Sequence, residues 1–226
     1  MQIYIKKENI DQNIQNISDH LESNIVFDEP KKSHYLVYDS NGLSFIKDSK
    51  NPREILHINF LKGALGWRMK RAQHESNLKK ALGKNNDQLT IFDATAGLLT
   101  DAMIFLSLGH KVIAVEQSKI LFCLVSDAIF RAKKDIPELK NLDFINDNSI
   151  NVYKRKHQQL DVIYLDPMYP ITKKNIKKSG NINAITKILK LENLENNEDE
   201  FISSFMESNY KKIILKRPFK SKKNYS

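Results

Sequence analysis

The sequence predicts an α/β fold in which a doubly wound, mostly parallel sheet follows a small N-terminal β-rich element. Two observations predict it. From Gln88 onward, short apolar runs alternate with helical patterns, which is typical of strand–helix–strand repeats with right-handed crossovers. Before that point the chain shows short strands and a hairpin signal. The 226 residues, 41% of them hydrophobic, suffice for one such domain with a small appendage, so we place a boundary between residues 1–60 and 61–226.

Five strands are expected in the larger part, with helices between them. The helix after the first strand is expected to begin at Thr100, which can cap it, and to end at Gly109. The next helix is capped by Ser118 and ends before Pro137. The apolar runs that predict the strands are residues 89–92, 111–115, 142–145, 161–165 and 211–215.

The N-terminal part combines two strand signals with a basic segment. Residues 3–8 predict a strand, and residues 34–47 predict a hairpin that turns at Asp39-Ser40-Asn41-Gly42, because Asn-Gly tolerates the positive φ of tight hairpins. Residues 63–83 mix bulky apolar residues with Lys and Arg, which predicts a basic turn leading into a helix that stops at Gly83.

The composition indicates a polyanionic partner. A net charge of +9 and a pI near 9.4 favour nucleic acid, because Lys and Arg that neutralise phosphates release bound counterions. The excess of Lys over Arg, and the richness in Asn and Ile, leave a second interpretation open, in which the nucleotide composition of the genome produces the bias. The basic residues must gather on one face for the first interpretation to hold.

The single cysteine excludes a disulfide framework and a cysteine-based zinc site. Cys123 lies in the apolar run 121–125, so we expect it in the core, and the protein in a reducing compartment. No apolar stretch is long enough for a membrane span, and the first residues lack a signal-peptide core, so we expect a soluble, cytoplasmic protein. The six histidines show no ligand spacing, and we assign no metal site.

Polar side chains follow four of the five expected strands. Because ligands of doubly wound sheets bind beyond the carboxyl ends of the strands, these side chains form a candidate site. After the first strand, the small residues 94–97 let a ligand approach the backbone ahead of a helix. The polar residues at the strand ends are Asp93, Glu116, Asp147, Asn148, Ser149 and Asp166.

The pairing of this first loop with Glu116 indicates a nucleoside ligand. An acidic residue at the end of the second strand can accept both hydroxyls of an adenosine ribose, although a solvated strand-end carboxylate is the alternative. The loop lacks the three glycines of the dinucleotide fingerprint, so a nucleoside without phosphates fits better. S-adenosylmethionine is such a nucleoside. The stretch DATAGLLTDA resembles the cofactor loop of class I methyltransferases, in which Asp93 and the turn containing Thr95 and Gly97 would face the methionine portion.

The stretch LDPMYP, residues 165–170, resembles the Asp/Asn-Pro-Pro-Tyr/Phe motif of methyltransferases that act on exocyclic amines. The lone pair of such an amine is delocalised into the ring, so the site must accept hydrogen bonds from its N–H groups and hold the nitrogen in line with the methyl donor. Asp166 can supply acceptors, Pro167 fixes the backbone, and Tyr169 can stack on a base taken out of its helix. A Pro-bounded turn with Tyr169 merely packed is the structural alternative.

Taken in order, the stretches FDATAGLLTDA, VEQS, VIYLDPMYP and IILKRP are similar to the ribosomal RNA small subunit methyltransferase J family, over roughly residues 60 to 220. The resemblance implies a Rossmann-like class I methyltransferase that uses S-adenosylmethionine, and no metal, to methylate the N2 amine of a guanosine in small-subunit (16S) rRNA. By position, it implies cofactor contacts from Thr100, Asp101, Glu116, Gln117, Asn148, Ser149 and Asp166.

RNA contacts are expected from three basic groups. The loop after the catalytic motif carries four lysines that could bind phosphates beside the site, and a solvated lysine loop is the alternative. The second group lies in the basic segment before the cofactor loop, and the third follows the last strand. The residues are Lys173, Lys174, Lys177 and Lys178, then Arg68, Lys70 and Arg71, and finally Lys216 and Arg217.

Two other functions stay open on the sequence alone. One is another exocyclic-amine methyltransferase, acting on DNA adenine or on a protein glutamine, which a comparison of acceptors would separate. The other is a non-catalytic RNA-binding protein that keeps the fold, which predicts no affinity for the cofactor.

Overall fold

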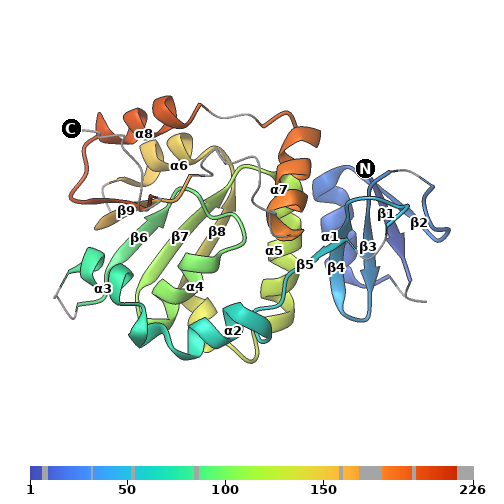
Figure 1. Cartoon of the computed structure of the whole chain (residues 1–226), viewed down its shortest axis with the longest axis horizontal. Helices are drawn as coiled ribbons and strands as arrows, with labels where there is room; N and C mark the ends of the chain where they lie inside the picture. The colour runs from blue at the N-terminus through green and yellow to red at the C-terminus, as the bar shows by residue number, and fades with distance from the viewer. Residues whose placement is uncertain are drawn as a thin grey trace. The chain divides into compact units, whose positions relative to one another are not determined.

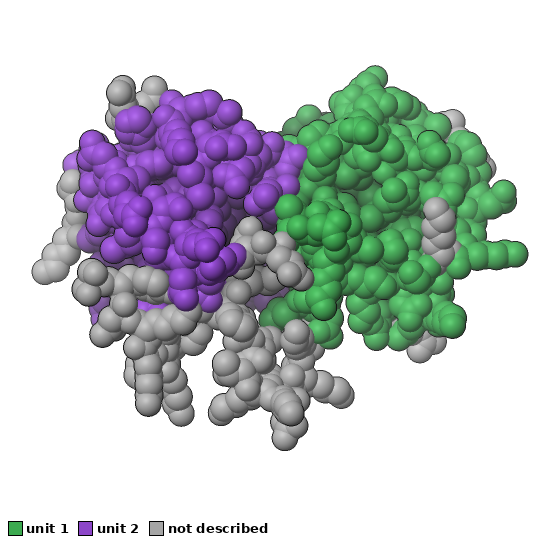
Figure 2. Space-filling view, turned by 90° about the horizontal axis from the view of Figure 1, so that it is seen from above, with its two compact units in different colours: residues 1–63, 118–137, 173–195 green, residues 64–117, 138–172, 196–226 purple. Residues whose placement is uncertain are grey.

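The computed structural model describes residues 1–6, 10–31, 33–51, 54–83, 87–157, 160–167, 180–194 and 197–217 (Figure 1). The chain divides into two compact units that interleave in sequence (Figure 2). Unit 1 comprises Met1–Gly63, Ser118–Pro137 and Lys173–Glu195, and unit 2 comprises Ala64–Gln117, Glu138–Thr172 and Asn196–Ser226. The boundary that we place between residues 60 and 61 stays a prediction.

The sheet of unit 2 is parallel throughout, as the alternating pattern predicts. Its strand order, β10-β9-β6-β7-β8, places the first strand of this unit in the middle. Each predicted strand is confirmed to within two residues at either end. The strands are β6 Thr90–Asp93, β7 Lys111–Glu116, β8 Leu142–Asn146, β9 Val162–Leu165 and β10 Ile213–Leu215.

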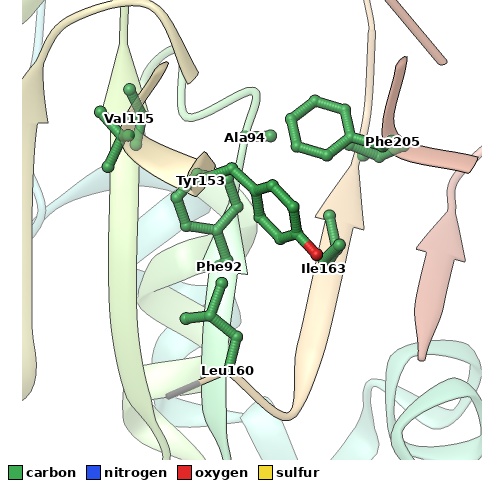
Figure 3. Packing of buried hydrophobic residues seen from close by; sticks show 9 residues of the cluster. Phe92, Ala94, Val115, Tyr153, Leu160, Ile163 and Phe205 are labelled. Atoms are coloured by element: carbon green, nitrogen blue, oxygen red, sulfur yellow. The ribbon is translucent and has the colours of Figure 1, made fainter. Parts of the chain in front are cut away.

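Helices cover both faces of this sheet, and β9 shows how its residues divide between them. Ile163 and Leu165 pack in a cluster with α6 (Ser149–Lys156) and α8 (Glu198–Met206), in which the rings of Phe92, Tyr153 and Phe205 meet (Figure 3). Tyr164 points the other way, and its ring makes an edge contact with Phe105 of α4 (Thr100–Ser107), 5.0 Å between centroids. This alternation follows from the two-residue period of a strand.

The basic segment before the first strand of unit 2 is helical over more of its length than predicted. It forms α2 (Gly63–Lys70), a short 3-10 turn (Ala72–His74) and α3 (Ser76–Leu82). The prediction that the helix stops at Gly83 is confirmed, since this residue ends α3 with φ +108°. The expectation that this segment opens with a basic turn is wrong, because its first residues form α2, where Ala, Leu, Met and Lys favour a helix.

The sheet of unit 1 is mixed, with order β2-β1-β3-β4-β5. The predicted hairpin is confirmed, with Ser40 and Asn41 between its strands, but only Gly42 takes a positive φ, +104°, so the expectation of a positive φ at Asn41 is wrong. The strands are β1 Gln2–Ile5, β2 Asn24–Val26, β3 Tyr35–Asp39, β4 Gly42–Ile46 and β5 Ile55–His57.

Unit 1 includes α1 (Gln12–Leu21), α5 (Lys119–Ala132) and α7 (Gly180–Leu191), and Asp127 of α5 joins its parts. This fully buried carboxylate accepts hydrogen bonds from Leu43 N, Asn13 Nδ2 and Arg131 Nε, at 2.8 to 3.0 Å. Three donors from three elements satisfy the buried charge, which would otherwise be costly. That arrangement explains why α5 groups with the N-terminal strands.

Two local predictions about α5 are confirmed. The hydroxyl of Ser118 accepts a hydrogen bond from Leu121 N at 3.0 Å and so caps the helix, and Cys123 is buried. The helix ends at Ala132, ahead of the 3-10 turn Pro137–Asn141. Among the described residues, no helix is long and apolar enough to cross a membrane.

Candidate active site

The candidate site lies at the carboxyl ends of β6, β7 and β9, all in unit 2. The strand order reverses between β6 and β9, because the connection after β6 leads to β7 on one side while β9 lies on the other. Such a switch point leaves a crevice beyond the strand ends, which is the usual ligand site of a doubly wound sheet. The predicted residues Asp93, Glu116 and Asp166 follow or end these three strands.

The loop after β6 is fixed from both sides. Gly97 N donates to Glu116 Oε2 at 2.9 Å, so the carboxylate that ends β7 holds the turn. Thr95 N donates to Asp93 Oδ1 at 3.0 Å, and Asp166 N donates to Thr95 Oγ1 at 2.7 Å. Thr95 therefore joins the loop directly to the motif that follows β9.

The start of α4 corrects one prediction. Thr100 is the first residue of the helix and not its cap; the cap position is Leu99, which makes no side-chain cap hydrogen bond. Both Gly97 and Leu99 have left-handed backbone, with φ +50° and +57°. Leucine adopts this region at a cost of about 1 kcal/mol or more, and its side chain is completely buried, so packing holds the strained turn in place.

Asp101, in the first turn of α4, is the centre of a polar cluster. Its Oδ2 accepts hydrogen bonds from Tyr164 Oη and Lys216 Nζ, both at 2.6 Å, and its Oδ1 lies 3.4 Å from Arg68 Nη2. Arg68 Nε in turn donates to Glu75 Oε1 at 2.7 Å. The position is favourable for an anion, because the helix dipole adds to these donors.

Lys216 links this cluster to the motif that follows β9. Its Nζ donates to Asp166 Oδ2 at 2.7 Å as well as to Asp101, and its backbone N–H donates to Leu165 O at 2.8 Å. Asp166 keeps about a third of its side chain exposed, so a ligand can reach it. Pro167 is half-buried beside it. Tyr169 lies outside the described residues, and its stacking role stays a prediction.

The ionisable groups respond to burial and to each other. Burial raises the pKa of Asp93 to about 7, and the charges of Asp101 and Asp166 act in the same direction. Burial also raises the pKa of Asp166, although Lys216 opposes it. At Asp101 burial would raise the pKa, but the donors Lys216, Tyr164 and Arg68 outweigh it and hold the pKa below its usual value.

The end of β8 supplies the third side of the site. Asn146 Nδ2 donates to the backbone oxygen of Glu116 at 2.7 Å and lies 3.3 Å from that of Gln117, which fixes the end of β7. Asn148 caps α6, since its Oδ1 accepts from the backbone N–H groups of residues 150 and 151. Ser149 is buried. A cofactor contact from Asn148 would therefore share an oxygen that already caps a helix.

The predicted RNA-binding residues fall into different environments. Lys70, Arg71 and Lys216 are exposed and Arg68 is half-buried, but the charges of Arg68 and Lys216 are paired with carboxylates of the same unit. Arg217 is half-buried. Lys173, Lys174, Lys177 and Lys178 lie outside the described residues, so their role stays a prediction.

The charged side chains at these strand ends fit a cationic nucleoside. The carboxylates of Asp93, Asp101, Glu116 and Asp166 outnumber the cations of Arg68 and Lys216 at these strand ends, which suits the ammonium and sulfonium charges of S-adenosylmethionine. The small side chains of residues 94–97 allow a ligand to approach the backbone of this loop. Within the described residues, no group of three or more His, Cys, Asp or Glu side chains is arranged to hold a metal ion.

Comparison with known proteins agrees with this geometry. A family model described as putative SAM-dependent methyltransferase, SAM being S-adenosylmethionine, matches residues 20–224. Ribosomal RNA small subunit methyltransferase J of Buchnera aphidicola is 32% identical over 226 aligned positions, covering 96% of this chain and 88% of that protein. The protein of the same name from Desulfotalea psychrophila is 31% identical, over 81% of this chain and 72% of its own.

The fold is also found among solved structures. The crystal structure of a SAM-dependent methyltransferase from Neisseria gonorrhoeae matches with a TM-score of 0.63 and 21% sequence identity, over 91% of this chain and 78% of that chain. At this identity the likeness concerns the fold alone, and it confirms the predicted methyltransferase fold. Since the family model and the relatives each match most of the chain, the chain belongs to the ribosomal RNA small subunit methyltransferase J family of S-adenosylmethionine-dependent methyltransferases.

Proposed function

We propose that this protein methylates the exocyclic N2 amine of a guanosine in small-subunit (16S) ribosomal RNA. The observation that carries the proposal is the hydrogen bond of 2.7 Å from Asp166 N to Thr95 Oγ1, which holds the amine-binding motif against the cofactor loop. The names of the relatives, which act on ribosomal RNA of the small subunit, support this substrate. We place the reaction in the cytoplasm, where bacterial ribosomes are made.

Residues at the ends of β6 and β7 and in the first turn of α4 would hold the cofactor. Glu116 would accept hydrogen bonds from the ribose hydroxyls, and Asp93 and Asp101 would face the positively charged methionine portion, with the backbone of residues 94–97 beside it. When bound, S-adenosylmethionine supplies an electrophilic methyl group. Because Glu116 and Asp101 are nearly buried, hydrogen bonds to them are stronger than those to solvated carboxylates.

Asp166 would receive the substrate amine. Its carboxylate can accept a hydrogen bond from the exocyclic N–H, and Pro167 restricts the backbone that positions it. As the nitrogen attacks, positive charge builds on it, and the Asp166 carboxylate stabilises this charge and can accept the proton that the nitrogen loses. Lys216 opposes the effect of burial on the pKa of Asp166, so the carboxylate stays available as an acceptor.

A comparison of acceptors tests the proposal. Protein and methyl-labelled S-adenosylmethionine are incubated separately with naked small-subunit rRNA, assembled small subunits, DNA and a glutamine-containing protein, and the products are digested and analysed by mass. We expect label in N2-methylguanosine from one or both ribosomal substrates, and none with Asp166→Ala. Label in DNA adenine or in glutamine would overturn the substrate, and absence of cofactor binding by calorimetry would overturn the enzymatic activity.

A further inference from the structure

An exposed tryptophan lies on the helix that reaches into the candidate site. Trp67 of α2 is 60% exposed, and the guanidinium carbon of Arg71 lies 4.8 Å from its ring centroid. Arg71 is the first residue after α2, and this contact holds the two planar groups together on the surface, with Lys70, the last residue of α2, also exposed. An indole left this exposed contributes little to the core, which calls for another explanation.

Another face of the same helix is bound to the carboxylate cluster. Arg68, next to Trp67 in the chain, donates to Glu75 at 2.7 Å and lies 3.4 Å from Asp101. Gly66 and Ala72 are buried, so α2 packs closely at both ends of this stretch and lies beside α4 (Figure 1). The exposed pair is therefore held at a fixed place within unit 2, on a segment that Arg68 joins to Asp101.

We propose that Trp67 and Arg71 form a stacking platform for an unstacked base of the RNA substrate, next to the base that is methylated. This inference rests on the proposed function, because single-stranded RNA is the partner that both require. Every base offers a flat π face that stacks on aromatic rings and on guanidinium planes, and recognition of splayed RNA bases commonly uses both. A flanking base held here would bring its neighbour toward Asp166.

Charge complementarity selects RNA over an apolar partner. The exposed cations Lys70 and Arg71 follow Trp67 closely in the chain, and the nearest acidic residue in the chain, Glu75, is bound to Arg68. A protein interface usually depletes lysine at its centre, whereas phosphates between stacked bases require cations beside the ring. The surface therefore suits a strand that alternates flat bases with negative charges.

Intrinsic fluorescence tests the platform directly, because Trp67 is the only tryptophan of the chain. The full-length protein is titrated with short oligomers of adenosine, of uridine, and of abasic ribose phosphate with the same number of phosphates. Stacking predicts strong quenching by the adenosine oligomer, weaker quenching by uridine and little by the abasic oligomer. Equal quenching by all three at equal occupancy would overturn the platform, because charge alone would then explain the signal.

Variants separate stacking from charge. Trp67→Ala should weaken affinity for the rRNA substrate about 5- to 150-fold, the range reported for loss of one base–aromatic stack, and should act mainly on KM. Trp67→Phe should recover part of the loss. Arg71→Lys keeps the charge but loses the planar guanidinium, so it should weaken binding without changing the salt dependence, whereas Lys70→Ala should flatten that dependence by about one ion.

Phe130 provides a matched control in unit 1. It is 48% exposed and Lys133 Nζ lies 4.4 Å from its ring centroid, but it belongs to α5 of unit 1, whereas the carboxylate cluster belongs to unit 2. Phe130→Ala should leave RNA affinity unchanged, and an equal loss from both alanine variants would overturn the specific role of Trp67. Circular dichroism and thermal melting establish that each variant folds.

The outcomes distinguish this inference from the proposed function. Methyl transfer to rRNA at wild-type efficiency by Trp67→Ala would overturn the platform and leave the proposed function standing. Base-dependent quenching with no methyl transfer would support the platform and overturn the proposed function. Concentration-dependent self-association that Trp67→Ala abolishes, with no quenching by RNA, would assign the surface to a second copy of the chain and overturn the inference.

Discussion

The ammonium of Lys216 lies 2.7 Å from Oδ2 of Asp166, and the same nitrogen lies 2.6 Å from Asp101 Oδ2. One cation thus serves two carboxylates that burial would otherwise drive toward the neutral form. The pKa of Lys216 itself is raised, because its two hydrogen bonds outweigh the effect of its partial burial. At neutral pH the lysine is therefore charged, and it favours an ionised Asp166.

Removing this cation should change the pH dependence of the reaction. Lys216→Met leaves burial and the charge of Asp101 to raise the pKa of Asp166 further, so fewer molecules carry an ionised Asp166 near pH 7. We expect the single-turnover rate at pH 7 to fall about tenfold or more, and the acidic limb of the pH–rate profile to move to higher pH. Lys216→Arg keeps the charge and should show a smaller shift.

The same variant separates two roles for Lys216. If Lys216 bound RNA phosphates, as predicted from the sequence, Lys216→Met would lower the slope of RNA affinity against salt by about one ion. Because its charge is already shared between two carboxylates, we expect that slope to stay unchanged. A flattened slope with an unmoved pH profile would return Lys216 to RNA binding.

The sequence predicted the strands of unit 2 because each is a short apolar run with a polar residue at its end. It could not show that α5 packs with the N-terminal strands, since that depends on Asp127, a charged residue inside an apolar helix whose partners Leu43 and Asn13 lie far away in sequence. The start of the basic segment was read as a turn because bulky apolar and basic residues are mixed there, whereas residues 63–70 form α2, which the contacts of Arg68 help to hold.

In the candidate site, too, some residues could be predicted from the sequence and others could not. Asp93, Glu116 and Asp166 were found because strand ends of a parallel sheet share one edge. Tyr164 was missed, because a tyrosine inside an apolar strand looks like core; its hydroxyl nevertheless donates to Asp101. The sequence did contain a signal that could have predicted the contact between Lys216 and Asp166. Lys216 and Asp166 are the first residues after β10 and β9, which are neighbouring parallel strands in register.

Glu116 allows a test of the cofactor site with two variants. The Glu116 carboxylate accepts from Gly97 N, so Glu116→Gln can keep the loop in place while losing charge, and Glu116→Ala loses both. We expect Glu116→Ala to weaken S-adenosylmethionine binding by about 1.5 to 3 kcal/mol, the scale of hydrogen bonds to a charged group, and Glu116→Gln to weaken it less. Calorimetry measures both, and wild-type affinity in Glu116→Ala would contradict the assigned role.

Asp93 should make the stability of the cofactor-free protein depend on pH. Its pKa is about 7 in the folded state, against an ordinary value of 3.8, so folding favours the protonated form. The contribution is fully present below about pH 4 and is lost as pH rises toward about 7. Asp93→Asn stays neutral, so its unfolding free energy relative to wild type should rise over that window by on the order of 2 to 4 kcal/mol.

Urea unfolding of both proteins at pH 5 and pH 8, without cofactor, measures this difference. Other titrating groups are common to the two proteins and cancel in the comparison. A difference that does not vary with pH would show that Asp93 is already ionised in the folded state, for which its hydrogen bond from Thr95 N would then be sufficient.

The last prediction concerns the chemistry at Asp166. Asp166→Asn keeps the shape and one acceptor oxygen, and its backbone N–H can still donate to Thr95 Oγ1, but it loses the negative charge that offsets the charge building on the attacking nitrogen. We expect the single-turnover rate to fall about 100-fold or more, as is typical when an electrostatic or proton-accepting group is lost, with cofactor affinity changed far less. Asp166→Ala also removes the acceptor, and its rate should fall further.

The measurement uses saturating S-adenosylmethionine and rRNA, so that binding does not affect the observed rate. Thr95→Val serves as the control that disturbs the loop while the Asp166 carboxylate remains. A folded Asp166→Ala protein that transfers methyl groups at the wild-type rate would rule out this mechanism.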